Sequence, residues 1–253
     1  MSVLHALVMA FSLFSTIPMP YITWDERTVR YMMAAFPAVG VVIGVLVWGW
    51  HALCAALGFG PMLCGVGYAL IPLAVSGGIH LDGFADVVDA QSSHAEPERR
   101  REILKDPHIG AFAAMGVSAY LLAYFALACE VPAEHVVLLA CVPVVSRCLS
   151  GYATVTFRTA SDKGMLAAEH ATASARVVRI VLGVVYAAVA GFMLLQEPVV
   201  AATILASSAV ALVLVRRLAD KSYGGMSGDL AGFFLQVAEL VMLACIVFAG
   251  RLV

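Results

Sequence analysis

Three aspartates that emerge directly from an apolar run are the residues of this chain best suited to chemistry. Asp82, Asp86 and Asp89 are spaced by four and then three residues. On an α-helix this spacing keeps all three side chains within an arc of roughly 60°, so that they project from one face. Neighbouring carboxylates repel one another unless a cation neutralises them, and oxygen ligands alone suit Mg²⁺ or Mn²⁺ shared with a substrate phosphate. The pattern therefore predicts a metal site on Asp82, Asp86 and Asp89.

A solvated helix end at a membrane surface is the other interpretation of these aspartates. Asp82 follows its apolar run with only His80 between them, and ionisable residues at membrane depth are functional by default. Gly77 and Gly78, just before His80, allow a backbone or a phosphate to approach closely, although glycine also serves simple packing between membrane helices. His80 itself suits hydrogen bonding or an interfacial position better than a general base.

A basic segment, Arg99–Gly110, follows the aspartates and contains two further candidates. Asp106, placed before Pro107, is either the N-cap of the next helix or a fourth metal ligand, and both interpretations stay open. Lys105 beside it is the better candidate for a phosphate contact. The arginines Arg99–Arg101 are explained more simply as the positive flank of a membrane helix.

Two more polar groups interrupt apolar runs later in the chain. Arg147, after Ser146, needs an anionic partner inside the bundle or must extend to the interface. The glycine-rich stretch Gly224–Asp229 precedes an apolar run that carries Glu239 ten residues further on. Backbone N–H groups at such a helix start can bind an anion.

The composition decides which elements can position these residues. Of 253 residues, 62% are hydrophobic and 13% charged, which excludes a water-soluble globule. The 15 basic residues do not exceed the 17 acidic ones, so we expect no nucleic-acid partner. Segments long and apolar enough to cross a bilayer are expected at 34–57, 61–79, 111–129, 135–152, 177–195, 199–215 and 230–249. The shorter segment 3–20 is either an eighth span, a re-entrant helix or an interfacial one.

Charge in the connections predicts the orientation of these spans. Nearly every Lys and Arg falls in connections on one side, whereas the opposite connections carry Glu130, Glu134 and Glu197, with Arg251 as the exception. The positive-inside rule assigns the basic side to the cytoplasm. No connection is long enough for a soluble domain. We therefore expect residues 1–253 to form a single all-α, polytopic membrane bundle of seven or eight spans with its active site at the cytoplasmic face.

The order of these motifs resembles a known family. Gly77–Asp86 with Asp89, followed by Glu102–Asp106 and by Ile109–Phe112, is similar to the hallmark of the cobalamin synthase (adenosylcobinamide-GDP ribazoletransferase) family. The likeness extends over nearly the whole chain, at Ile17–Pro20, Phe36–Gly44, Ser146–Arg147, Gly224–Asp229 and Glu239. The chain departs from the family pattern at Phe157–Met165, where a compact Arg-Pro-x-Gly-like turn is expected.

The resemblance implies a Mg²⁺-dependent, multi-pass enzyme of the bacterial cytoplasmic (inner) membrane. Such an enzyme joins adenosylcobinamide-GDP to α-ribazole or its 5′-phosphate, and releases adenosylcobalamin or its 5′-phosphate together with GMP. The implied partners are these two small molecules and the lipid bilayer, and a homo-oligomer is an open alternative to a monomer.

The resemblance also implies roles for individual residues. The metal ligands are Asp82, Asp86 and Asp89. Catalysis falls to Asp82, Asp106, Asp229 and Lys105, where Asp106 or Asp229 completes the metal site or accepts the proton of a ribose hydroxyl, and Lys105 offsets charge on the departing GMP. Arg147 shares that last role. Substrate-binding positions are Gly77, Gly78, His80, Arg147, Gly225 and Glu239.

Two alternatives use the same residues differently. A CDP-alcohol phosphotransferase requires Asp-Gly-x-x-Ala-Arg, but Asp86 and Val87 stand in place of the alanine and the arginine, so the match fails. An ion-coupled transporter would pass ions along Asp82, Arg147 and Glu239. The sequence shows no repeated halves of the kind that transporters often have, and its carboxylates gather near one face.

Overall fold

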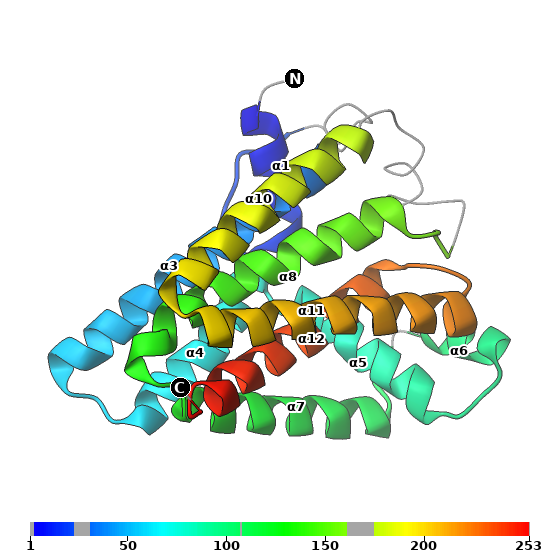
Figure 1. The fold of residues 1–253 in the computed structure, drawn as a ribbon. Helices are drawn as coiled ribbons and strands as arrows, with labels where there is room; N and C mark the ends of the chain where they lie inside the picture. Colours follow the sequence, from blue (N-terminus) through cyan, green and yellow to red (C-terminus); the bar gives the residue numbers. More distant parts are fainter. Residues whose placement is uncertain (1–2, 23–30, 107, 161–174, 253) are drawn as a thin grey trace.

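A bundle of helices makes up this computed structural model, which describes residues 3–22, 31–106, 108–160 and 175–252 (Figure 1). The helices are α1 (Val3–Phe14), α3 (Met32–Leu57), α4 (Pro61–Ser76), α5 (Ile79–Ser92), α6 (Pro97–Ile103), α7 (Ala111–Cys129), η1 (Ala133–His135), α8 (Val136–Thr156), α10 (Ala175–Gln196), α11 (Pro198–Leu218), the π-helical turn η2 (Ala219–Tyr223) and α12 (Gly228–Ala249). One isolated parallel bridge joins Thr159 to Met226.

Within the described ranges, six helical segments are long and apolar enough to cross a membrane. They are α3, α7, η1 with α8, α10, α11 with η2, and α12. The helices α4 and α5 pass the same test only together, and they are bent by 94°, so counting them as one broken span gives seven. The predicted all-α polytopic bundle is therefore confirmed with six to seven candidate spans.

The predicted span 61–79 is wrong in its detail because the helix stops early. α4 ends at Ser76, and the next two residues, Gly77 and Gly78, have φ values of 62° and 78°. Glycine adopts this left-handed region without the steric cost that a side chain adds, so the pair breaks the helix. The chain then leaves α4 in a new direction as α5, which carries the aspartates away from the apolar run.

The apolar N-terminal segment packs against this bend and does not extend across the bundle. α1 has 12 residues, fewer than the roughly 20 that a span needs. After it, Thr16 donates a hydrogen bond from its backbone N to the carbonyl oxygen of Val75 (2.8 Å) and from its hydroxyl to that of Ala74 (2.9 Å). Both carbonyls belong to the last turn of α4, where a helix leaves its carbonyl oxygens without regular intrahelical donors; that of Ala74 also accepts a longer bond from the backbone N of Gly77 (3.4 Å). The segment therefore caps α4 beside the bend.

The two ends of the bundle differ in charge. α6, the end of α11 and the start of α12 lie at one end, whereas the C-terminus and the start of α11 lie at the other (Figure 1). The first end carries Arg99, Arg100, Arg101, Lys105, Arg158, Arg216, Arg217 and Lys221. Arg251, the exception, forms an ion pair with Glu130 at the opposite end, so this cation has a local anionic partner.

Candidate active site

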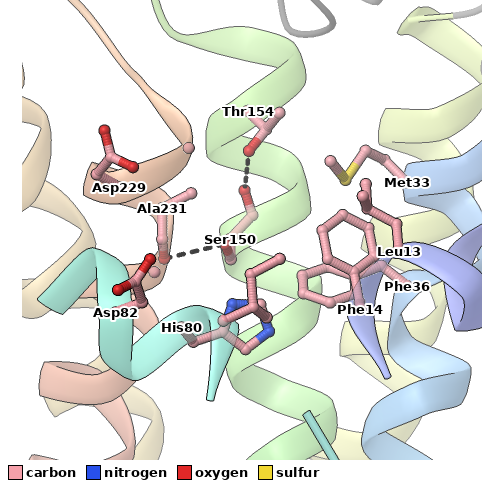
Figure 2. A pocket seen from close by; sticks show the side chains of 13 residues that line it. Leu13, Phe14, Met33, Phe36, His80, Asp82, Ser150, Thr154, Asp229 and Ala231 are labelled. Carbon is pink, nitrogen blue, oxygen red and sulfur yellow. Dashed lines mark hydrogen bonds between the residues drawn. The ribbon is translucent and has the colours of Figure 1, made fainter. Parts of the chain in front are cut away.

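A cavity of about 210 Å³ lies where α1, α3, α5, α8 and α12 meet. Its lining includes the apolar side chains of Leu13, Phe14, Met33, Phe36 and Ile79 and the polar ones of His80, Asp82, Ser150, Thr154 and Asp229. Figure 2 shows the carboxylates of Asp82 and Asp229 on one side and the rings of Phe14 and Phe36 on the other, with His80 between them. The cavity thus has a carboxylate side and an aromatic side.

Close contact between α5 and α12 brings the two carboxylates together. A Cβ atom on Gly83 would lie 2.8 Å from the carbonyl oxygen of Asp229, and one on Gly232 would lie 2.9 Å from that of His80. Each helix therefore has a glycine where the other helix's backbone touches it, as is common where membrane helices pack closely. As a result, one cavity is lined by both Asp82 and Asp229, although these residues are 147 positions apart in the sequence.

Asp86 completes a cluster of negative charge at this contact. Asp82, Asp229 and Asp89 all interact electrostatically with its half-buried carboxylate. Among the described residues, none of Asp82, Asp86 and Asp229 forms an ion pair with a lysine, arginine or histidine. Like charges gathered without a counter-charge favour the binding of a cation.

The donor set of this cluster fits Mg²⁺ as an ion shared with a substrate. No group of three or more His, Cys, Asp or Glu side chains in the described part of the chain forms a ready-made metal cage. Mg²⁺ does not require one, because it usually keeps several waters and binds through one or two carboxylates plus phosphate oxygens. Asp82, Asp86 and Asp229 supply oxygen donors only, as this mode of binding requires.

Asp89 has a structural role at the start of α7 that the sequence did not suggest. Its Oδ1 accepts a hydrogen bond from the backbone N of Ala113 (3.3 Å), in the first turn of α7. Gly110, the N-cap residue of α7, leaves room for this carboxylate, because a Cβ atom there would collide with Asp89. Asp89 therefore caps α7 from a distant position in the chain. The role of Asp89 as a metal ligand stays a prediction, because its Oδ2 is not used in this hydrogen bond and can still bind a cation.

Asp106 and Lys105 are exposed and do not line the cavity. Oδ1 of Asp106 bonds to Nδ1 of His108 (2.7 Å) and accepts from its backbone N (3.0 Å), and these two bonds hold the pKa of Asp106 below its usual value. The predicted N-cap role of Asp106 is wrong, because α7 begins at Ala111 with Gly110 as its N-cap. Pro107 lies outside the described residues. Catalytic roles for Asp106 and Lys105 stay predictions.

Arg147 and Glu239 form an ion pair in the interior of the bundle. Nη1 of Arg147 lies 2.7 Å from Oε1 of Glu239, and Ser146 donates a second hydrogen bond to the same oxygen (2.7 Å). The two residues are 1% and 2% exposed. Arg147 thus has the anionic partner that its burial required. Substrate-binding roles for this pair stay predictions, since in this structure the two residues bind each other.

The glycines predicted to bind substrate have structural roles here. Gly77 and Gly78 form the bend between α4 and α5. Gly225 has a φ of 148°, and a Cβ atom on it would lie 2.6 Å from the carbonyl oxygen of Arg158. The neighbouring Met226 donates its backbone N–H to that oxygen (2.7 Å), so Gly225 lets the loop before α12 contact the segment that follows α8. Whether these glycines also touch substrate stays a prediction.

Arg100, assigned from the sequence to the positive flank, has a specific position in the structure. It donates hydrogen bonds to the side chains of Gln91 (3.1 Å) and Ser222 (3.3 Å), and Gln91 in turn donates to the hydroxyl of Tyr223 (3.0 Å). This network joins α6 to α5 and η2. Its neighbours Arg99 and Arg101 pair with glutamates of α6 itself.

Sequence reasoning missed the apolar and hydroxyl lining of the cavity. Ser150 donates to the carbonyl oxygen of Ala231 (3.4 Å), and Thr154 donates to that of Ser150 (2.9 Å). Their spacing of four residues inside an apolar run was a usable signal for one polar helix face. Phe14 and Met33 gave no such signal, because single apolar residues on a membrane helix are ordinary, and Phe36 was marked only as part of the family-like segment Phe36–Gly44.

Comparisons with known proteins identify a family that this chain resembles over nearly its whole length. The family model for cobalamin-5-phosphate synthase matches residues 6–247. The chain is 37% identical to the adenosylcobinamide-GDP ribazoletransferase of Lachnoclostridium phytofermentans, over 97% of this chain and 94% of that protein. It is 30% identical to the proteins of the same name from Clostridium botulinum (95% and 96% covered) and Geobacillus kaustophilus (93% and 92%). No solved structure matches the chain.

Proposed function

The chain belongs to the cobalamin-5-phosphate synthase family, and from this membership we propose that it joins adenosylcobinamide-GDP to α-ribazole, or to its 5′-phosphate, with release of GMP. The observation that supports this most directly is the meeting of Asp82 and Asp229, from two different helices, on one side of a cavity whose other side is aromatic. Such a cavity can bind a nucleoside and hold its ribose against carboxylates.

The transfer needs one oxygen–phosphorus bond to form and one to break. A ribose hydroxyl of the acceptor attacks the phosphorus that carries the corrinoid, and the bond to the GMP phosphate breaks. Asp229 lines the cavity together with Asp82, so we assign to Asp229 the removal of the hydroxyl proton. Asp106 is exposed and bonded to His108, which makes it the weaker candidate for this step. The proton passes to the carboxylate, and GMP leaves with the electron pair of the broken bond.

Asp82 and Asp86 are the residues that would hold Mg²⁺, with Asp89 at the edge of the cluster and Asp229, the proton acceptor, beside them. When bound there, a divalent ion would shield the diphosphate charge and stabilise the leaving phosphate. The side chains themselves orient the substrate, because their helices are fixed against each other at Gly83 and Gly232.

We further propose that the protein is a multi-pass protein of the bacterial cytoplasmic membrane, with the basic end of the bundle in the cytoplasm. The carboxylate cluster includes Asp229, in the first turn of α12, and α12 starts at that basic end (Figure 1). Water-soluble substrates would then reach the site from the compartment that contains the nucleotides.

Purified protein in detergent tests the proposal. We expect GMP and a cobamide to form from adenosylcobinamide-GDP and α-ribazole with Mg²⁺ and not with EDTA. Asp82→Asn and Asp229→Asn should each lower the rate at least about 100-fold, because each removes a charged group from the metal and proton-transfer site. Asp220 is exposed and paired with Arg216, and it does not line the cavity. The variant Asp220→Asn is therefore the matched control and should leave the rate unchanged. Near-normal rates for both site variants would reject this mechanism.

A further inference from the structure

His80, which lines the cavity beside its aromatic side, has a buried polar atom without a partner. Nε2 of His80 has no hydrogen-bond partner among the described residues, and the residue is only 6% exposed. A buried nitrogen left unpaired costs free energy, so most such groups in folded proteins have a partner. His80 lines the cavity, beside the phenylalanines in Figure 2. A ligand in the cavity can supply the missing partner.

The walls around His80 suit a flat ring. The ring of Phe14 is stacked on that of His80, with centroids 6.1 Å apart and planes 25° apart, and the ring of Phe36 lies 5.7 Å from His80. Met33 and Leu13 complete this apolar wall. Aromatic rings and thioethers bind flat π-systems through offset stacking and sulfur–aromatic contacts. An apolar cavity of roughly 150 Å³ takes up benzene in another protein, so about 210 Å³ leaves room for a fused bicyclic ring.

Resting on the proposed function, we propose that this aromatic side binds the heteroaromatic base of the nucleoside acceptor and that Nε2–H of His80 donates a hydrogen bond to the free ring nitrogen of that base. A benzimidazole joined to ribose through one nitrogen has a single remaining polar atom, the other ring nitrogen, which accepts one hydrogen bond. His80 offers one donor beside the apolar rings of Phe14 and Phe36, so the two groups match in number and kind.

The other parts of the substrates fit this pocket poorly. Guanine has several donors and acceptors, and apolar walls would leave most of them unsatisfied at a cost. The corrinoid is far larger than the cavity. With the base against Phe14 and Phe36, the ribose extends toward Ser150, Thr154 and the carboxylates of Asp82 and Asp229, which line the remaining wall. The attacking hydroxyl then faces Asp229, as the proposed transfer requires.

A paired comparison of protein variants and acceptor analogues tests the proposal. The acceptors are α-ribazole and its analogue in which the free ring nitrogen is replaced by CH, an indole riboside. In the unchanged protein we expect the KM of the indole riboside to exceed that of α-ribazole by about 10-fold or more, the effect of one buried unpaired donor. In His80→Phe the two KM values should be equal, and the KM of adenosylcobinamide-GDP should stay unchanged.

Two further measurements separate this inference from a structural role of His80. His51→Phe, on α3 outside the cavity lining, is the control variant and should preserve the preference for α-ribazole. Phe36→Leu should weaken the binding of both acceptors by a similar factor, measured by equilibrium dialysis without Mg²⁺ or the second substrate. A wild-type protein that transfers to both acceptors equally well, or a His80→Phe variant that keeps the preference, would overturn the inference. A protein that performs no transfer at all rejects the proposed function itself.

Discussion

At the scale of residues, four aspartates that look alike in sequence have different surroundings. Asp82 and Asp229 line the cavity, and Asp86 interacts electrostatically with the other three carboxylates. Asp89 accepts a hydrogen bond through its Oδ1 from the first turn of α7. The three aspartates of α5 are therefore not equivalent despite their regular spacing, because Asp89 alone accepts a hydrogen bond from the first turn of α7.

The capping role of Asp89 leads to a prediction that separates it from a metal ligand. Asp89→Asn keeps an oxygen that accepts from Ala113, so we expect GMP release to fall less than about threefold. Asp89→Ala removes the cap and should destabilise the protein by about 1 kcal/mol, measured as a lower midpoint of thermal unfolding in detergent. If Asp89→Asn instead loses as much activity as Asp82→Asn, Asp89 is a ligand after all.

The buried pair of Arg147 and Glu239 leads to a second prediction. Glu239→Gln leaves the guanidinium in the interior without a counter-charge, and loss of one partner of a buried pair typically costs about 3–5 kcal/mol. Thermal unfolding should therefore shift to a clearly lower temperature. The double variant Arg147→Met with Glu239→Leu should recover most of that stability, since both charges are gone. Unchanged unfolding of the single variant would show that the pair contributes little.

At the scale of elements, two glycine features determine where the carboxylates lie. The bend at Gly77 and Gly78 directs α5 away from the apolar run. The contact at Gly83 and Gly232 then brings α5 against α12. Asp82 and Asp229 line one cavity where both features are present.

Alanine substitutions at the contact test its importance. A methyl group at Gly83 or Gly232 would lie 2.8–2.9 Å from the opposing backbone, so the helices must move apart. We expect Gly83→Ala and Gly232→Ala to reduce GMP release at least about 10-fold through displaced catalytic groups. Gly183→Ala in α10, where nothing lies within 4 Å of the added methyl, is the control. Full activity of both contact variants would mean that the helix spacing is not critical.

At the scale of the whole molecule, charge is distributed unevenly between the two ends of the bundle. Among the described residues, Arg251 is the one Lys or Arg at the end opposite α6, and its ion pair with Glu130 offsets it locally. The basic residues are thus gathered at one end of the bundle, as the positive-inside rule requires of a membrane protein with a fixed orientation.

Labelling of intact cells can check the orientation. We expect a membrane-impermeant maleimide to modify Glu134→Cys from outside and to modify Asp220→Cys only after the membrane is opened. Both positions are exposed, and they lie at opposite ends of the bundle. The parent protein with its six native cysteines supplies the background. The reverse labelling pattern would place the basic end outside the cytoplasm.

Local pattern alone determined the helical membrane class, the approximate spans and the acidic helix face. Hydropathy over about 20 residues and the 3.6-residue helical period are properties of contiguous sequence, and each apolar run must form a helix because lipid offers no hydrogen-bond partners. The same reasoning required either an anionic partner for Arg147 or its extension to the interface, since burial of a lone charge is unfavourable.

Tertiary structure alone decided which of these residues meet. The pairing of Asp82 with Asp229, the capping of α7 by Asp89 and the pocket of Phe14, Phe36 and His80 all join segments far apart in the chain. Such contacts depend on how helices turn and cross, here through backbone approaches that glycine permits. A spacing rule describes one helix at a time, so it cannot say which side chain of another helix lies opposite.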